Sequence, residues 1–396
     1  MRVLHIGKFY PPFAGGMENF LGDLLPSLKR LGVDVSALVH NHRDSGRKAK
    51  TTNFPVYRVP RYGNLLYAPV SPEFPLVLKQ VIKKFRPDIL HMHMPNTSAF
   101  WIMTLSCARR IPWVVHWHAD VVPSEIDRRM AVAYRLYRPF EQHLLRRAVT
   151  IIATSRPYLI TSKALYPWRN KCTVIPLGID SARLKMPGGV FRKWAEGIWS
   201  HKRTRVLAIG RLTYYKGHEV LIRAAARAPD LRVLVVGEGD RKRRLDSLIA
   251  ELGLRERVTL LGFLEEARLH ALLASCDCLC LPSVERTEAF GLVLLEAMRY
   301  AKPVVASDVP GSGIGWVVKH EETGFLVPPG DSIQLARALG VMAEVPALRG
   351  RMGQAAEERF NKIYEIDRVS TEIRGVYQAI LNNRGNAYLL PKCSIK

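Results

Sequence analysis

The 396-residue sequence has little cysteine, no long hydrophobic run and no recognisable leader at its start. Six scattered cysteines are too few to cross-link a chain of this length, which predicts a reduced, cytoplasmic protein. The longest apolar stretch, from Thr97 to Ala108, spans about a dozen residues, fewer than the roughly 18 that a membrane-spanning helix needs. Residues 1–7 lack the apolar core and cleavage site of a signal peptide, so we expect them to form a first buried strand.

Acidic residues are scarce, above all in the first half of the chain. Residues 1–185 hold 28 of the 59 Lys and Arg but only 11 of the 35 Asp and Glu, a net charge of +17. Residues 186–396 hold the other 31 and 24, a net charge of +7, which brings the total to +24. The excess predicts an anionic partner for the first half: nucleic acid, acidic lipid headgroups or a phosphorylated substrate.

Short apolar runs alternate with segments of helical periodicity along the whole chain, and the alternation starts anew near residue 206. Such alternation is typical of an α/β protein in which helices cover both faces of parallel sheets. Two series predict two doubly wound domains. The expected strands are 3–6, 33–39, 89–91, 113–116 and 151–153, then 206–209, 231–236, 258–261, 278–281 and 303–306, with helices expected at 18–31 and 74–85.

The break between the two series gives the expected domain boundaries. We predict a first domain at 1–185, a linker at 186–205 that contains Pro-Gly-Gly, and a second domain at 206–370. A helix and tail at 371–396 are expected to return to the first domain. Ligands of open parallel sheets bind at the carboxyl ends of the strands, so the residues there are the functional candidates.

The first expected strand is followed by the paired glycines Gly15 and Gly16. They allow the backbone to approach a ligand and leave amide groups at a helix N-terminus, which suits a phosphate or sugar hydroxyls. A tight strand-to-helix turn explains the same pair equally well.

Four histidines follow two later strands: His91 and His93, then His116 and His118, with Asp120 close behind. They could form a zinc site, but alternate positions of a strand place each pair on one face without a third ligand at defined spacing, so we expect no metal. We expect His91 and His116 to be satisfied core residues. A histidine such as His118 can instead orient substrate hydroxyls or stabilise developing charge.

The second series opens with a strand that ends at Gly210, followed by Arg211, Lys216 and Gly217. Two cations beside a helix N-terminus suit a diphosphate. Each cation taken singly could equally be a solvated surface charge.

The most informative motif runs from Pro282 to Met298 and contains two carboxylates, Glu288 in a loop and Glu296 in the following helix. A helix that starts near Phe290 and Gly291 offers backbone N–H groups to an anion or a sugar hydroxyl. Glu288 can accept hydrogen bonds from ligand hydroxyls, and Glu296 can reach a ribose. Alternatively, Glu296 stands in an apolar helix by chance, where it would be costly without a partner.

Three further features carry less weight. The glycines at 311, 313 and 315 are interpreted as a ligand-approach loop, because the full dinucleotide-binding fingerprint is missing. The cysteines at 276, 278 and 280 alternate as along a strand, and the basic run 241–244 is interpreted as a solvated helix face.

Taken together, these motifs resemble the retaining glycosyltransferases of family 4, which have the GT-B fold: two Rossmann-like domains that face each other across a cleft. The resemblance runs from Met1 to about Asp331 and rests on the order of the Gly15–Gly16 loop, the His118 strand end, the Arg211–Lys216 loop and the Glu288–Glu296 pair.

The resemblance implies a hexosyltransferase whose second domain binds a nucleotide-diphosphate sugar and whose first domain binds the acceptor. It implies no metal and no other cofactor, and a same-face substitution in which the departing phosphate takes the acceptor's proton. By residue, Arg211 and Lys216 match the diphosphate-binding pair, Glu288, Phe290 and Gly291 the loop that contacts the donor sugar and its phosphates, Glu296 the ribose ligand, His118 the sugar-contacting histidine, and Gly15 and Gly16 the loop near the donor phosphate and the acceptor.

The loop from Asp308 to Trp316 departs from the family pattern, in which many relatives have a glutamate. With His118-Ala-Asp120 it resembles the subgroup that transfers mannose or rhamnose from GDP-sugars in bacterial O-antigen or exopolysaccharide assembly. A UDP-sugar stays possible.

The charge excess then suggests a lipid-linked acceptor at an anionic membrane surface. The arginines of segment 128–147 and the Trp-containing basic patches at 191–194 and 199–203 could lie on the inner face of the cell membrane, and solvated helix faces are the alternative. Two other functions remain open: a basic nucleic-acid-binding protein, and an epimerase or hydrolase of sugar nucleotides on the same fold.

Overall fold

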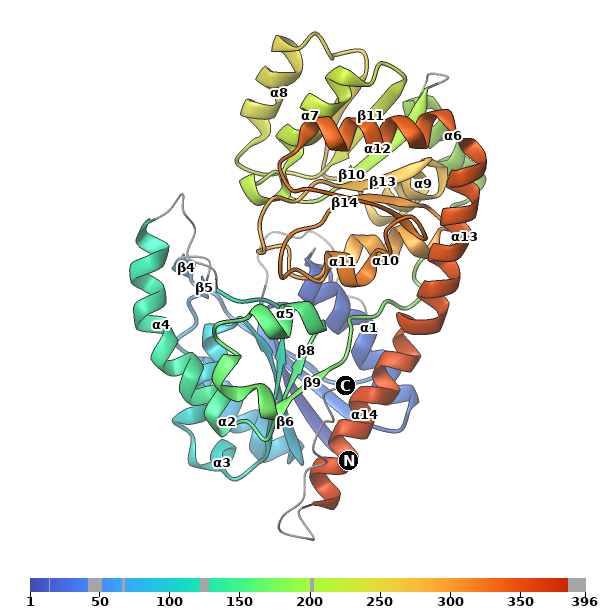
Figure 1. Cartoon of the computed structure of the whole chain (residues 1–396). Coiled ribbons are helices and arrows are strands. Elements are labelled where there is room, and N and C mark those ends of the chain that lie inside the picture. The colour runs from blue at the N-terminus through green and yellow to red at the C-terminus, as the bar shows by residue number, and fades with distance from the viewer. Residues whose placement is uncertain (14, 42–51, 66–67, 122–127, 200–202, 384–396) are drawn as a thin grey trace. The chain divides into compact units, whose positions relative to one another are not determined.

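The computed structural model describes residues 1–13, 15–41, 52–65, 68–121, 128–199 and 203–383 (Figure 1). The chain divides into two compact units. The first contains Met1–Ile179 together with the segment that begins at Ile366, and the second contains Asp180–Glu365.

The first unit is built on a seven-stranded parallel sheet in the order β3-β2-β1-β6-β7-β8-β9. Nearly every side chain of its central strands is buried, as strands covered on both faces require, and the buried side chains are apolar or histidine. The elements are β1 Arg2–Ile6, α1 Gly16–Arg30, β2 Asp34–His40, β3 Val56–Val59, β4 Asn64–Leu65, β5 Ala68–Pro69, α2 Phe74–Phe85, β6 Ile89–Met94, the 3-10 helix Thr97–Met103, α3 Ser106–Arg109, β7 Trp113–Trp117, α4 Arg128–Arg147, β8 Thr150–Ala153, α5 Arg156–Thr161, a second 3-10 helix Tyr166–Lys171, β9 Cys172–Val174 and α14 Ile366–Asn382.

The second unit has a six-stranded parallel sheet in the order β12-β11-β10-β13-β14-β15. Helices again alternate with the strands, so both domains are doubly wound and the α/β prediction is confirmed. The elements are α6 Gly189–Trp199, β10 Thr204–Ile209, the 3-10 helix Tyr214–Lys216, α7 His218–Arg227, β11 Leu231–Val236, α8 Lys242–Glu251, β12 Val258–Gly262, α9 Glu266–Ser275, β13 Cys278–Leu281, α10 Leu292–Arg299, β14 Val304–Ser307, α11 Ile314–Val317, β15 Gly324–Val327, α12 Ser332–Glu344 and α13 Pro346–Ile363.

Across each sheet the strand numbers first fall and then rise, so the order of the strands in the chain reverses at one strand. In the first unit β1 lies between β2 and β6, and in the second β10 lies between β11 and β13. The loops that leave such neighbouring strands diverge to opposite faces of the sheet, and the crevice between them is where open α/β sheets bind ligands. The two places to search are therefore the carboxyl ends of β1 with β6 and of β10 with β13.

The segment expected to be a linker, 186–205, is structured over much of its length and lies in the second unit. It contains helix α6, whose Ala195 and Trp199 are buried, and the Trp199 indole donates a hydrogen bond to Ser275 Oγ at 2.9 Å. Pro-Gly-Gly at 187–189 suggested a connection, whereas the apolar face that follows it packs as a helix. Residues 200–202 of this segment lie outside the described part of the chain.

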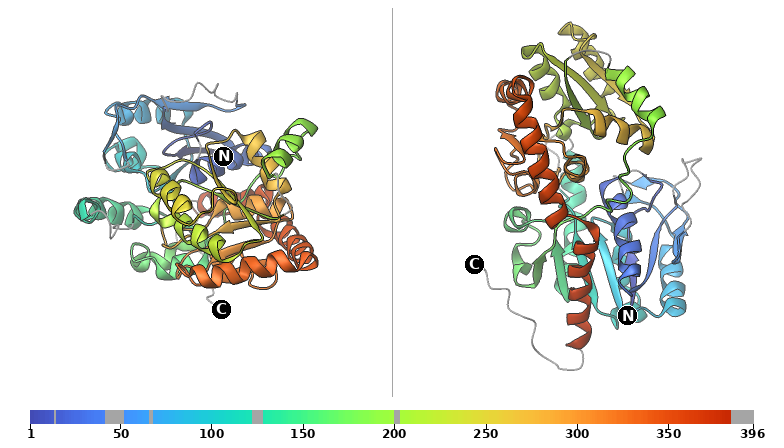
Figure 2. Two further views of the ribbon diagram at one scale, coloured as in Figure 1. Left: turned by 90° about the horizontal axis from the view of Figure 1, so that it is seen from above. Right: turned by 90° about the vertical axis from the view of Figure 1, so that its right-hand side faces the viewer.

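The C-terminal helix α14 packs against α1 in the first unit, and Figures 1 and 2 show the two helices side by side. Ser27 Oγ donates to an Asp367 carboxylate oxygen at 2.6 Å, and Arg374 donates to the Leu31 carbonyl at 3.2 Å. The returning segment begins at Ile366, a few residues before the expected 371, and the tail from 384 on lies outside the described residues.

Candidate active site

The loop after β10 and the loop after β13 are tied to each other in the second unit. The Val284 amide donates to the Tyr215 carbonyl at 2.8 Å. Gly217 has a φ of +66°, and a Cβ built there would lie 1.9 Å from the Pro282 carbonyl oxygen. Only glycine allows so close an approach in the left-handed region. The glycine of the sequence motif therefore brings together two loops that are far apart in the chain.

This approach places Lys216 against Glu288. Lys216 Nζ lies 2.5 Å from a Glu288 carboxylate oxygen, and Ser283 Oγ donates to the same oxygen at 3.2 Å. Exposed fractions of the two charged side chains are only 12% and 11%. Burial opposes the charge on Lys216, but the Glu288 carboxylate and Tyr215 outweigh it, so the pKa of Lys216 is raised. Lys216 stays an ammonium group beside a polar loop.

Arg211 is placed on the exposed side of the same loop by Tyr215. Arg211 Nη2 donates to the Tyr215 hydroxyl at 3.0 Å, and the tyrosine ring lies 6.0 Å from the Arg211 guanidinium and 5.8 Å from Lys216 Nζ. Cations near an aromatic face are attracted by its quadrupole. Tyr215 therefore holds two cations in one loop, which suits a ligand with two phosphate groups.

Phe290 and Gly291 form the entrance to helix α10. Gly291 has a φ of +77°, and its Cβ would lie 2.9 Å from both Leu281 and Leu294 side chains, so the position requires glycine. Phe290 is buried with its edge toward Tyr364. It serves to anchor the helix N-terminus, whose first N–H groups are available to an anion or a hydroxyl.

The glycine-containing loop 311–315 lies against the Glu288 loop. The Gly313 amide donates to the Ala289 carbonyl at 2.7 Å, and Ser312 Oγ donates to the Glu288 carbonyl. On the other side, Arg286 Nε donates to the Gly311 carbonyl at 3.1 Å. These bonds fix the backbone around Glu288.

Glu296 is buried in the second turn of α10, and an arginine neutralises it. Arg183 Nη2 lies 3.6 Å from Glu296 Oε1, and another Arg183 nitrogen lies 3.1 Å from Glu266. The buried carboxylate therefore has a charged partner, and its role as a ribose ligand stays a prediction. A ribose at Glu296 would share the carboxylate with Arg183.

Among the first-unit candidates, Gly15 is the extended residue that precedes α1, and Gly16 is the first residue of that helix. A Cβ at Gly15 would lie 2.2 Å from a Glu18 carboxylate oxygen, whereas one at Gly16 would meet nothing within 4 Å. One turn further, the Phe20 ring contacts His118 edge-on at a centroid distance of 5.6 Å. The glycine loop and His118 thus lie near the carboxyl end of the same sheet.

His118 is the end of a chain of buried histidines. His118 Nε2 lies 2.9 Å from His93 Nδ1, and His93 Nε2 lies 3.1 Å from His5 Nδ1. Burial lowers the pKa of both His5 and His118 to about 3, and lowers that of His93 well below its usual value. All three rings are therefore neutral, and each bond has one donor and one acceptor nitrogen. His5 was not selected from the sequence, although a histidine is visible there in the first expected strand.

Two more histidines, His91 and His116, complete the cluster. His91 Nδ1 is bonded to the Tyr377 hydroxyl of α14 at 2.5 Å, but its buried Nε2 has no hydrogen-bond partner among the described residues, so this core histidine is satisfied at one nitrogen only. His116 was expected to be satisfied too, but neither of its ring nitrogens has a hydrogen-bond partner among the described residues. Its ring stacks on that of His118 at a centroid distance of 4.4 Å.

The cluster also contains two sets of three nitrogens that could hold a metal ion. Within each set the nitrogens lie within 4.8 Å of one another, and neutral imidazoles are good ligands for zinc. His93, the one ring that belongs to both sets, is already hydrogen-bonded to His118 and His5 and stacks on His118 at a small interplanar angle. The absence of a metal therefore stays a prediction. The sets are His5, His91 and His93, and His93, His116 and His118.

Comparison with known proteins identifies the family of the chain. The family profile described as "Glycosyl transferases group 1" matches residues 193–359, and "Glycosyl transferase 4-like domain" matches residues 15–178. D-rhamnosyltransferase WbpZ of Pseudomonas aeruginosa is 30% identical over 371 residues, 92% of this chain and 92% of that protein. O-antigen chain mannosyltransferase C of Escherichia coli is 27% identical over 388 residues, 97% of this chain and 100% of that protein.

Solved structures give the same fold. Anabaena HepE in complex with UDP-glucose matches with a TM-score of 0.77 at 23% identity over 96% of this chain and 99% of that one. Sucrose-phosphate synthase from Thermosynechococcus elongatus matches with a TM-score of 0.78 at 24% identity over the same shares.

The chain belongs to the family 4 type of glycosyltransferases, with the GT-B fold, and is a hexosyltransferase. The matches do not favour a nucleic-acid-binding protein, an epimerase or a hydrolase.

Of the residues selected from the sequence, the structure brings Lys216 and Glu288 into contact and places Arg211 beside them. Phe290, Gly291 and Glu296 follow on the adjoining helix. Tyr215 and Ser283, which position the charged groups, were not predicted from the sequence. Both stand inside the motifs, but their contacts arise only when the loops meet.

Proposed function

We propose that the chain transfers a hexose, with retention of configuration, from a nucleotide-diphosphate sugar bound by the second unit to an acceptor bound by the first. The proposal rests on the ion pair of Lys216 and Glu288, which is buried between the loops that follow the neighbouring strands β10 and β13. Phosphate-binding cations and a hydroxyl-binding carboxylate side by side match the two ends of such a donor.

In the proposed reaction the bond between the sugar C1 and the departing phosphate oxygen breaks. A bond from the acceptor oxygen to C1 forms on the same face, and the acceptor's proton passes to the departing phosphate. Arg211 and Lys216 stabilise the charge that develops on the diphosphate. Glu288 positions the sugar hydroxyls, His118 contacts the sugar from the other unit, and the Gly15–Gly16 loop adjoins the donor phosphate and the acceptor. No separate protein base and no metal are needed in this scheme.

For the donor we propose GDP-mannose or GDP-rhamnose, with a UDP-sugar as the alternative. Support comes from the two relatives named mannosyltransferase and rhamnosyltransferase and from the glycine-containing loop after β14, which has no glutamate between Asp308 and Trp316. Glu296 is the proposed ribose ligand. The acceptor is a glycan, free or linked to polyprenyl diphosphate, in cell-surface polysaccharide assembly.

For location we propose the cytoplasmic face of the membrane, with anionic lipid as a partner. Support comes from helix α4, where Val132, Leu136 and Phe140 are 61%, 72% and 54% exposed, one turn apart, beside the exposed Arg135 and Arg138. Side chains of Arg128 and Arg129 lie outside the described part of the chain. No helix within the described residues is long and apolar enough to cross a membrane.

A transfer assay tests the proposal. The protein is incubated with a synthetic polyprenyl-diphosphate oligosaccharide and, in separate reactions, GDP-mannose, GDP-rhamnose, UDP-glucose and UDP-galactose. We expect a product with one GDP-sugar, an anomeric configuration equal to that of the donor, and undiminished turnover in EDTA. Product of inverted configuration, or turnover that requires a divalent ion, would contradict the proposed mechanism.

A further inference from the structure

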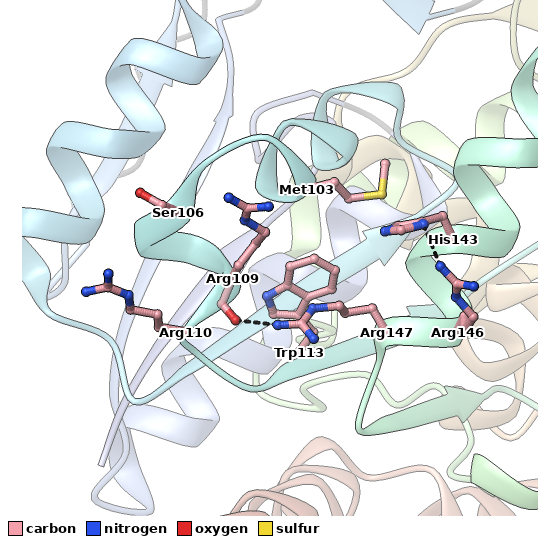
Figure 3. Close-up of a pocket in the computed structure, with 8 residues that line it drawn as sticks. All are labelled: Met103, Ser106, Arg109, Arg110, Trp113, His143, Arg146 and Arg147. Atoms are coloured by element: carbon pink, nitrogen blue, oxygen red, sulfur yellow. Dashed lines mark hydrogen bonds between the residues drawn. The ribbon is translucent and has the colours of Figure 1, made fainter.

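A cavity of about 770 Å³ in the first unit is lined by an unusual number of arginines (Figure 3). None of the residues that line it is acidic. We call it the arginine pocket, and the residues that matter for the argument are Arg109, Arg110, Trp113, His143, Arg146 and Arg147.

The arginine pocket lies at the amino end of a strand whose carboxyl end leads to His118. Trp113 is the first residue of β7, whereas His118 follows the last residue of that strand. Extended backbone from residue 113 to residue 118 spans roughly 16 Å. The pocket is therefore separate from the place where His118 lies.

One guanidinium of the pocket is held in place before any ligand binds. Arg147 lies over the Trp113 ring at 5.4 Å from its centroid, and Arg147 Nη2 donates to the Arg109 carbonyl at 2.6 Å (Figure 3). A guanidinium has five N–H donors, so most of those of Arg147 remain for a ligand. A fixed arginine fork loses little freedom when it binds an oxyanion.

A second guanidinium is fixed by a histidine. Arg146 Nη2 lies 3.2 Å from His143 Nδ1. Because arginine is always a donor, His143 Nδ1 is the acceptor of this bond. Beneath them, Lys171 Nζ donates to the Arg146 carbonyl at 2.6 Å and to the Ala148 carbonyl at 3.2 Å, which satisfies the end of α4.

Arginine at the end of a helix has an ordinary explanation, since it complements the helix dipole. That explains Arg109 in the last turn of α3 and Arg146 and Arg147 in the last turn of α4, each helix taken alone. It does not explain why two such ends converge on one cavity, because like charges in one cavity repel each other. A bound anion would relieve the repulsion.

We propose that the arginine pocket binds a phosphoryl group, as a phosphate ester or a diphosphate. Arginine forks pair with two phosphate oxygens at once, and the cavity is larger than a single phosphate ion, so a ligand with more than one phosphoryl group or a headgroup fits it. The phosphoryl group could belong to a lipid headgroup or to a soluble phosphate compound. This inference does not depend on the proposed donor or acceptor.

The test compares the full-length chain with Arg109→Ala/Arg146→Ala. This pair removes two guanidinium groups but keeps the backbone carbonyls that hold Arg147 and Lys171. The control, Arg337→Ala/Arg351→Ala, removes the same charge from exposed positions on α12 and α13. Binding is measured by calorimetry with inorganic phosphate and pyrophosphate at constant ionic strength, and by flotation with phosphatidylglycerol or phosphatidylcholine vesicles. GDP binding is measured on every preparation as a check of the second unit's fold.

We expect one site per chain and at least a tenfold loss of affinity in Arg109→Ala/Arg146→Ala, with the control unchanged. Loss confined to phosphate and pyrophosphate identifies a soluble compound, and loss confined to phosphatidylglycerol identifies a lipid headgroup. The proposal is overturned if neither ligand binds the wild type, or if the pocket variant and the control bind equally well. If GDP binding is unchanged in all three proteins, the donor site is intact, and either outcome then concerns the arginine pocket alone.

Discussion

The ammonium group of Lys216 lies 2.5 Å from the carboxylate of Glu288, although the two residues belong to different sequence motifs. They follow β10 and β13, which are neighbours in the sheet but not in the chain. In the proposed reaction, a diphosphate that enters this place competes with Glu288 for Lys216, and the freed carboxylate then accepts hydrogen bonds from the hydroxyls of the sugar. On this proposal the ion pair is the ligand-free state of the donor site.

Replacement of Glu288 by glutamine separates these roles. Glu288→Gln keeps the size of the side chain but leaves Lys216 buried without its counter-charge, and we expect unfolding free energy to fall by up to about 3 kcal/mol. Transfer is expected to fall at least 100-fold, while nucleoside diphosphate binds as well as before or better. Calorimetry measures the unfolding free energy and the nucleotide binding, and the transfer assay measures the transfer rate.

Two further variants control this prediction. Glu285→Gln changes a carboxylate in the same loop, one that accepts a hydrogen bond from Thr287 Oγ1, and should leave turnover nearly unchanged. Lys216→Met/Glu288→Gln removes both charges and should recover part of the lost stability but no activity. Activity within a factor of about two of the wild type in Glu288→Gln would remove Glu288 from the site.

The close approach at Gly217 predicts a contrast between two glycines with the same backbone conformation. Gly217 and Gly253 both have a φ of +66°, but a Cβ at Gly253 would meet nothing within 4 Å. Gly253→Ala should cost about 1 kcal/mol, the penalty of the left-handed conformation alone. Gly217→Ala should cost more, because the β10 and β13 loops must separate, and should also weaken nucleotide binding. Equal losses of thermal stability would show that the loops are not in contact.

The histidine cluster predicts opposite effects for two similar substitutions. His116→Leu removes two buried nitrogens that lack partners among the described residues, and should raise stability by about 1 kcal/mol at pH 7.5. His91→Leu leaves the buried Tyr377 hydroxyl without its partner and should lower stability by about 1–3 kcal/mol. Urea denaturation of both variants gives the two values. A destabilised His116→Leu would mean that the nitrogens have a partner, such as a metal ion.

Stability should fall steeply in mild acid. Burial lowers the pKa of His5 and His118 to about 3, against 6.5 for an unfolded histidine, so the unfolded state takes up protons first as pH falls. Above pH 6.5 the effect is absent, and between pH 6.5 and 3 each such histidine contributes a loss of about 1.4 kcal/mol per pH unit.

Thermal unfolding at pH 7.5, 6.5, 5.5 and 4.5 measures this dependence. His118→Gln should flatten the profile in acid, whereas His320→Gln, at a side chain that is 52% exposed, serves as the control. An unchanged profile in His118→Gln would mean that the ring is not held neutral by the fold.

The sequence predicted the central strands of both sheets because these are buried on both faces and appear as continuous apolar runs. It missed β3, β9 and β15, which are edge strands of four, three and four residues, too short or too mixed to stand out. At β15 the strand begins with Gly324, whose Cβ would lie 2.0 Å from the Val304 carbonyl, and a glycine is typical of a loop.

The candidate site was predictable as motifs but not as contacts. Arg211, Lys216, Glu288 and Glu296 stand out as charged residues next to glycines or in an apolar helix. Their partners depend on which strands are neighbours, and the sequence order does not show this. The histidine cluster has the same origin, since His5 and His91 are paired in register across β1 and β6.

The most direct test of the account is calorimetric titration of the full-length protein with GDP, UDP, ADP and dTDP, for the wild type and for Arg211→Ala/Lys216→Ala. The pair Arg223→Ala/Arg337→Ala, exposed on α7 and α12, controls for the lost charge. We predict tight binding of one nucleotide, GDP in preference to the others, weakened at least 100-fold in Arg211→Ala/Lys216→Ala and unchanged in the control. Equal binding by all three proteins, or no binding of any of the four nucleotides by the wild type, would contradict the assignment of the donor site.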